Sequence, residues 1–278
     1  MTKHDIHYQN NPFNIGLNGL QLLFKRAQSV GIYAAILAGI GILISTAANV
    51  IDTVSKMNTP DYDTSPYVMH ASSTPSSVNV GVLIAVLVGV LLVAVITMLV
   101  SALLYGVLEY TSAKLAQGKN VTLGEALSAT FKRLHGYFWV YVVMFVKIFL
   151  WTLLLIVPGI IMAVRYSLSG IVFFAENKRG NAAVKRSAEL TKGAWFTTFA
   201  GTGLWNLITL GMIPWVITPS ANAILYRQFK ATTDSGSKKP GAHWLSWLTF
   251  FGPLVLFVIL FGFIILFALV IFGLWLAK

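Results

Sequence analysis

The sequence predicts an all-α, polytopic helical membrane protein with about seven transmembrane helices, cytoplasmic amphipathic connecting helices and two tight outer hairpins. Hydrophobic residues make up 56% of the 278 residues, whereas charged residues make up only 10%. The basic residues fall mainly between the apolar segments, where their placement indicates topology. Five apolar runs exceed the roughly 20 residues that a spanning helix needs: 29–51, 79–107, 137–164, 195–218 and 244–276.

The composition also excludes several kinds of protein. The net charge of +11 is scattered over short loops instead of one soluble face, so we expect no nucleic-acid partner. Cysteine is absent, which excludes disulfides, a thiol nucleophile and a thiolate metal site. No metal-ligand spacing or intramembrane acid pair occurs, so we expect neither a cofactor nor an enzyme. The N-terminal stretch does not resemble a cleavable signal, and we expect it to be retained.

Charge places the first two connecting segments on opposite sides of the membrane. Residues 1–28 hold three basic residues against one aspartate and are expected to form an amphipathic cytoplasmic segment. The loop at 52–79 holds three aspartates against one lysine and is expected outside. The next loop, 106–136, has a net charge of +2 and returns to the cytoplasm. A first span at 29–51 and a second at 79–107 satisfy all three placements.

The third and fourth apolar runs must each turn back, because a single span would export the basic segment that follows it. In the third run, Pro158 and Gly159 are expected to form the outer turn, since proline lacks an N–H and glycine relaxes backbone sterics. A single kinked helix is the alternative. In the fourth run the expected turn is 211–214, which gives helices at about 195–211 and 213–229.

These turns predict a six-span membrane domain at 29–230, followed by a cytoplasmic linker at 231–243. An extra C-terminal span at 244–278 begins with interfacial tryptophans and is expected to place the C-terminus outside. It is either one long span or an interfacial helix followed by a span. We therefore expect a multi-pass protein of the cell membrane with a cytoplasmic N-terminus.

Three amphipathic segments, at 17–26, 123–135 and 181–195, precede spans and suggest an internally repeated fold. Any helix at a membrane interface has a similar pattern, which is the alternative to a repeat. We expect the bilayer itself to be a partner, with anionic lipids at its cytoplasmic face. The basic residues expected to contact those lipids are Lys178, Arg179, Lys185, Arg186 and Lys192.

One part of the chain resembles a known bacterial family. It reads VPGIIMAVRY at 157–166, AEN at 175–177 and KRSAELTKGAW at 185–195. These stretches resemble the membrane domain of glycerophosphoryl diester phosphodiesterases and related uncharacterised bacterial polytopic proteins, over roughly residues 12–230. The resemblance implies a helical membrane domain with cytoplasmic amphipathic connectors. It does not imply the phosphodiesterase reaction, which in such enzymes belongs to an appended soluble domain for which this chain has no room.

Four polar residues inside predicted spans are the candidate functional residues: Lys147, Arg165, Asn206 and Asn222. The two cations could form a cavity for an anionic headgroup or solute, with the asparagines donating hydrogen bonds. Glu109 and Glu176 are the candidate counter-ions. Alternatively, Lys147 extends its long stem toward the interface, Arg165 caps carbonyl groups, and the asparagines join helices to each other.

We therefore expect a non-enzymatic integral membrane protein with a role in membrane or lipid homeostasis, or one that acts as a scaffold for a protein partner. The alternative is a transporter or channel for an anionic lipid or solute that uses Arg165 and Lys147. A water-accessible cavity that reaches either cation would favour transport, whereas a fully packed bundle would favour the scaffold.

Overall fold

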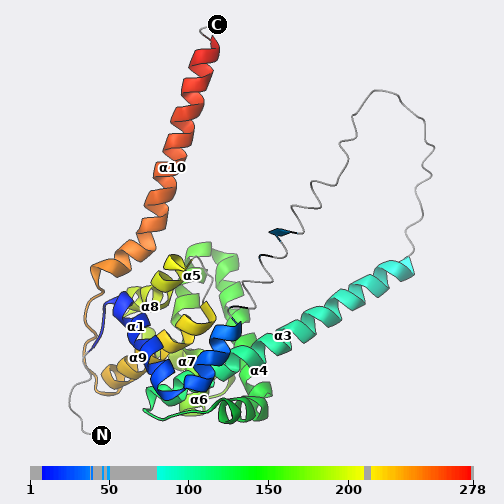
Figure 1. Ribbon diagram of the computed structural model, residues 1–278, viewed down its shortest axis with the longest axis vertical. Coiled ribbons are helices and arrows are strands. Elements are labelled where there is room, and N and C mark those ends of the chain that lie inside the picture. The colour runs from blue at the N-terminus through cyan, green and yellow to red at the C-terminus, as the bar shows by residue number, and fades with distance from the viewer. Residues whose placement is uncertain are drawn as a thin grey trace.

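The computed structural model describes residues 8–37, 39, 46, 49–50, 80–209 and 214–276, and the elements of these residues are all helices (Figure 1). The outer loop expected at 52–79 and residues 211–213 of the second expected turn lie outside the described residues. The helices are α1 (Pro12–Arg26), α3 (Val80–Ala116), α4 (Leu123–Leu154), α5 (Ile156–Tyr166), α6 (Ser169–Glu176), α7 (Gly180–Thr191), α8 (Trp195–Ile208), α9 (Pro214–Asp234) and α10 (Trp244–Leu276).

Side-chain caps define where two of these helices begin. The Asn11 side chain accepts a hydrogen bond from the Phe13 N–H, and Pro12 occupies the first turn of α1, where a missing N–H leaves no bond unmade. The Thr122 hydroxyl accepts a hydrogen bond from the Glu125 N–H at 3.3 Å. This bond confirms one half of the capping box that the sequence TLGE suggests at the start of α4.

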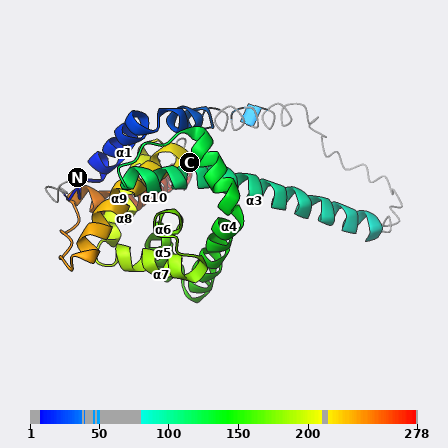
Figure 2. The ribbon, with the colours of Figure 1, turned by 90° about the horizontal axis from the view of Figure 1, so that it is seen from below.

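A helical bundle forms the packed part of the molecule. It consists of α1, α6, α7, α8 and α9 together with the C-terminal half of α3 and the N-terminal part of α4 (Figures 1 and 2). Tyr137, Phe173 and Phe229 are the largest side chains in its interior, and each is almost completely buried. Gly19 lets α1 approach α9 closely, since a Cβ there would lie 2.7 Å from the backbone of Ser220.

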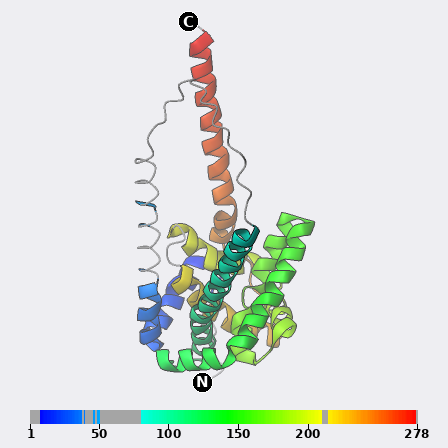
Figure 3. The ribbon, with the colours of Figure 1, turned by 90° about the vertical axis from the view of Figure 1, so that its right-hand side faces the viewer.

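Three apolar extensions leave this bundle, and their described side chains are exposed. They are residues 84–100 of α3, residues 149–157 at the tip formed by α4 and α5, and residues 254–268 of α10. Figures 1 and 2 show that α3 projects well beyond the bundle, and Figures 1 and 3 show the same for α10. Exposed leucine, isoleucine and phenylalanine in such numbers mark a surface that water does not solvate well.

Four helical segments in the described residues are long and apolar enough to cross a membrane: Val95–Ala116, Leu123–Leu154, Ile156–Glu176, which comprises α5 and α6, and Trp244–Ala268. The span expected at 29–51 contains a shorter apolar helix, Gln28–Leu37, and its remainder lies largely outside the described residues. The helix α8 has only 14 residues. The all-helical class is therefore confirmed, and four of the expected spans have the required length and apolarity.

The structure corrects the position of the first expected turn. The chain turns at Leu155, whose backbone is extended, and Pro158 and Gly159 lie in the first turn of α5. Proline is tolerated there because the first N–H groups of a helix have no partner within it. Gly159 allows α5 to pack against α4, since a Cβ at this position would lie 2.2 Å from the Thr152 Oγ1.

Two further boundaries differ from the expected ones. The amphipathic segment 123–135 is continuous with the apolar segment that follows it, because α4 is a single helix of 32 residues. At the other end of the domain, α9 continues to Asp234, so the first four residues of the expected linker 231–243 are helical. In both cases polar residues extend an apolar helix beyond the hydrophobic run from which its length was predicted.

Candidate functional site: a basic and aromatic pocket

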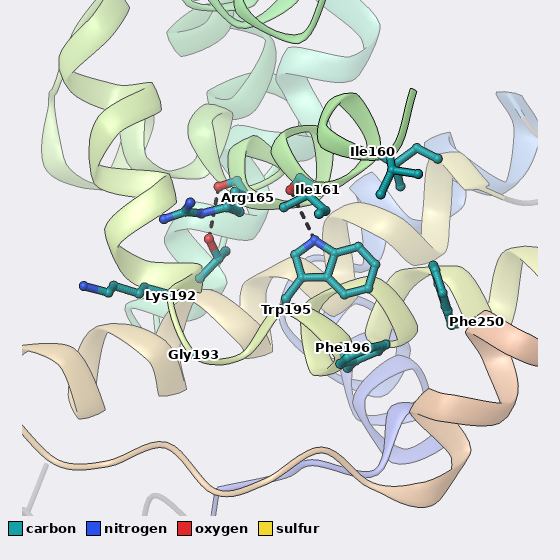
Figure 4. A pocket seen from close by; sticks show the side chains of 10 residues that line it. Ile160, Ile161, Arg165, Lys192, Gly193, Trp195, Phe196 and Phe250 are labelled. Atoms are coloured by element: carbon teal, nitrogen blue, oxygen red, sulfur yellow. Dashed lines mark hydrogen bonds between the residues drawn. The ribbon is translucent and has the colours of Figure 1, made fainter. Parts of the chain in front are cut away.

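A pocket of about 570 Å³ lies between α5, the turn from α7 to α8, and the start of α10 (Figure 4). Two basic side chains lie at one end, and aromatic and branched apolar side chains line the rest. The lining residues are Val157, Ile160, Ile161, Arg165, Thr191, Lys192, Gly193, Trp195, Phe196 and Phe250. The pocket therefore combines positive charge with an apolar wall.

A break between α5 and α6 positions Arg165. The helix ends at Tyr166, and the Ser187 hydroxyl of α7 bridges the break. It donates to the Arg165 carbonyl at 2.8 Å and accepts from the Leu168 N–H at 3.1 Å. The Thr191 hydroxyl donates to the same carbonyl at 3.1 Å. Backbone groups that the break leaves unpaired are thus satisfied by α7, which holds Arg165 beside the α7–α8 turn.

Arg165 and Lys192 form the basic end of the pocket. Figure 4 shows both side chains extending toward the same side of the pocket, with Ile160, Phe196 and Phe250 toward the other. Neither side-chain cation makes a hydrogen bond or an ion pair with another described residue. Two cations that have no acidic partner within the described chain leave this end of the pocket able to accept an anion.

Aromatic rings from α8 and α10 form the opposite wall. The Trp195 indole donates to the Ile161 carbonyl at 3.2 Å, which ties α8 to α5. The ring of Phe250 meets the rings of Trp195 and Phe196 edge-on, with centroids 5.4 and 5.8 Å apart. Such contacts stabilise a defined ring arrangement. The first turns of α10 therefore complete a wall that α8 begins.

An ion-pair network holds α7 in place from its polar side. Arg186 contacts Glu176 at 3.3 Å and Asp234 at 2.7 Å, and it is mostly buried. Lys178 and Lys230 also contact Glu176, at 3.3 and 4.0 Å. This network links the end of α6 to α7 and α9, so the helix that positions Arg165 is fixed on both sides.

Lys239 closes the C-terminal end of α7. Its Nζ donates to the carbonyl groups of Leu190 and Lys192, the latter at 2.8 Å, and lies over the Phe229 ring. A cation is favourable at the carbonyl end of a helix. Burial, with a smaller contribution from the charge of Arg186, lowers the pKa of Lys239 to about 8.

The structure separates the residues that the sequence suggested might act together. Lys147 Nζ donates to the Asn181 Oδ1 at 2.5 Å, at the opposite end of α7 from Arg165. Asn206 and Asn222 do not line the pocket, and their Oδ1 atoms are buried without a hydrogen-bond partner among the described residues. Neither Glu109 nor Glu176 pairs with Lys147 or Arg165 in the described part of the chain.

The five basic residues expected at the membrane surface fall into two groups, those paired with Glu176 and those that are exposed. Arg186 and Lys178 are engaged with Glu176, whereas Arg179, Lys185 and Lys192 are exposed. Lys192 belongs to the pocket. Arg186 therefore pairs within the bundle, with Glu176 and Asp234. The basic cluster in the sequence does not indicate this pairing.

The sequence did not identify the aromatic wall of the pocket. Phe250 lies 54 residues after Phe196, and no local pattern links the two. The residues that the structure describes contain no group of three His, Cys, Asp or Glu side chains that could hold a metal ion. Comparison of the chain with protein-family models, curated proteins and solved structures finds no match. The resemblance to the phosphodiesterase membrane domain stays a prediction.

Proposed function

We propose that this protein is a non-enzymatic integral membrane protein that binds an anionic amphiphile and serves membrane lipid homeostasis. The observation that carries the proposal is the pocket with Arg165 and Lys192 at one end and Phe196 and Phe250 at the other. A phosphate or carboxylate group would contact the cations, and an acyl chain would lie along the aromatic wall. A free phosphate would leave that wall unused, so the chemistry favours a lipid.

The proposed setting is the cell membrane, with the three apolar extensions in contact with lipid. The seven-span topology, the cytoplasmic N-terminus and the outer tip at Leu155 belong to this proposal. The exposed residues 84–100, 149–157 and 254–268 support it, because exposed apolar surface of this extent is stable against hydrocarbon and costly in water. The basic segment between α6 and α8 would then face the cytoplasm.

Lipid binding at the pocket is favoured over a transport site formed jointly by Lys147 and Arg165. Asn181, which holds Lys147, and Thr191, which contacts the Arg165 carbonyl, are ten residues apart on α7, or about 15 Å along a helix. One headgroup cannot contact both ends of α7. Lys147 instead has the geometry of a lysine that extends toward a polar partner from an apolar helix.

The test compares lipid retention by the purified full chain and its variants. Native mass spectrometry after extraction from a membrane with phosphatidylglycerol and phosphatidylcholine would count the bound lipids. We expect Arg165→Gln and Lys192→Gln each to lower phosphatidylglycerol retention by about tenfold, since a charge-assisted hydrogen bond contributes about 1.5–3 kcal/mol. Lys185→Gln, an exposed position on α7 outside the pocket, is the control. Equal losses in all three variants would reject the pocket as the site.

A further inference from the structure

The carboxyl group of Glu109 lies inside the helical bundle without a counter-ion. Its residue is 1% exposed, and its Oε2 makes no hydrogen bond with any described residue. No Lys, Arg or His in the described part of the chain forms an ion pair with it, although the sequence has 20 Lys and Arg residues. A buried acid is normally paired, so an unpaired one indicates a partner that the chain itself does not supply.

The surroundings of this carboxyl are aromatic. Tyr105, one turn earlier on the same face of α3, and Tyr137 and Tyr141 of α4 lie within electrostatic reach of Glu109. The rings of Tyr137 and Tyr141 have centroids 4.9 Å apart, and those of Tyr105 and Tyr141 are 6.4 Å apart. On the opposite side, the carboxyl packs against Gly170 of α6, where a Cβ would lie 3.0 Å from the Glu109 Cδ.

These tyrosines line a cavity of about 320 Å³ between α3 and α4. The remaining lining residues are Met98, Ser101, Ala102 and Phe138. Met98 belongs to the apolar extension of α3, so the cavity reaches the exposed apolar surface. Glu109 lies behind the cavity wall, one helical turn after the lining residue Tyr105 on the same face of α3. An apolar entrance and aromatic walls exclude a hydrated ion and suit a ligand with an apolar body.

We infer that this cavity binds a lipophilic organic cation, such as a quaternary ammonium with an aromatic substituent, and that Glu109 balances its charge. Aromatic faces attract ammonium groups, and a carboxylate supplies the opposite charge that such a ligand needs in an apolar site. An anionic ligand would find no opposite charge here, because a carboxyl group is either neutral or negative. This site is separate from the basic pocket and does not depend on its proposed function.

Charge balance also predicts that a proton is released when the cation binds. Without a ligand, an isolated carboxylate in this interior is costly, so the site holds a proton. When the cation enters, the O–H bond of Glu109 breaks, the proton leaves to water, and the carboxylate remains opposite the cation. The titratable groups close to the carboxyl are Tyr105 of α3 and Tyr137 and Tyr141 of α4, and α6 lies against it at Gly170. From α1 and α9, no described charged side chain forms an ion pair with it.

The experiment is calorimetric titration of the purified full chain in neutral detergent with benzyltrimethylammonium. Its neutral carbon isostere, neopentylbenzene, is the matched control ligand. We expect the cation to bind about tenfold or more tightly than the isostere, as a desolvated cation–π contact and a carboxylate require. We also expect about one proton to be released, measured by repeating the titration in two buffers of different ionisation enthalpy.

Variants then assign the binding to Glu109. Glu109→Gln should abolish the preference for the cation and the proton release, whereas Glu125→Gln, at an exposed acid on α4, and Arg165→Gln should retain both. Equal affinity of the wild-type chain for the two ligands, or cation binding without proton release, would overturn the inference even if Glu109→Gln fails to fold. Retention of cation binding by Arg165→Gln separates this site from the basic pocket.

Discussion

The bundle and the apolar extensions are both helical and rich in apolar residues. The bundle buries its apolar side chains, whereas the extensions expose theirs. In α6, Ile171, Val172 and Phe173 are buried on all sides by neighbouring helices. In α10, Phe257, Phe261 and Phe263 are exposed. A helix that is hydrophobic all round is therefore compatible with either environment. What distinguishes the two regions is whether other elements of the chain reach the helix, and the composition of the helix does not report this.

The largest expected difference between the two regions is their accessibility from outside the cell. Since the chain has no cysteine, single cysteines can be probed with an impermeant maleimide in intact cells. Leu155→Cys, at the tip of the α4–α5 extension, should label from outside. Lys119→Cys and Arg179→Cys, both exposed on the bundle, should label only after the membrane is opened. Outside labelling at Arg179→Cys would reject the hairpin topology.

Truncating a phenylalanine in each region should produce a large difference in stability. Phe173→Ala removes a buried ring that packs against Tyr137 and the Arg133 guanidinium, and should lower the free energy of unfolding by about 3 to 5 kcal/mol. Phe263→Ala removes an exposed ring of α10 and should leave that free energy almost unchanged in detergent. Denaturation followed by circular dichroism measures both. Similar losses in the two variants would mean that α10 packs as the bundle does.

The smallest expected effect concerns pH and the half-buried Lys239, whose pKa of about 8 lies below its ordinary 10.5. Between these values the unfolded chain binds a proton that the folded chain does not. The contribution of Lys239 to the free energy of unfolding is therefore greatest above about pH 10.5, and it is lost as the pH falls toward about 8. Relative to Lys239→Met, the wild type should gain thermal stability between pH 7 and pH 10. Parallel melting curves for the two proteins across this range would contradict the prediction.

Local features account for what could be predicted about the fold. The cap at Thr122 and the polar face of 181–195 act within a few residues, and each corresponds to a described helix boundary or helix. Four helical segments of the described residues match the expected apolarity. The turn near Pro158 was predicted three residues too late, because proline fits the first turn of a helix as well as a turn between helices. Lys147 bonds to Asn181, and the extension of its stem toward the membrane interface stays a prediction.

The helical class, the apolar segments and the placement of Lys147 and Arg165 within apolar segments could be predicted from the sequence, because hydrophobic periodicity, capping and composition depend on neighbouring residues. Packing between helices set which helices are enclosed, which cation lies beside Arg165, and which acid has no counter-ion among the described residues. Lys192, not Lys147, lies beside Arg165 in the pocket, and Phe250 of the distant helix α10 also lines it. Arg186 pairs with Glu176. The physical reason is that these contacts depend on close packing between helices far apart in the chain, where burial and pairing are set by the shape of the neighbouring helix.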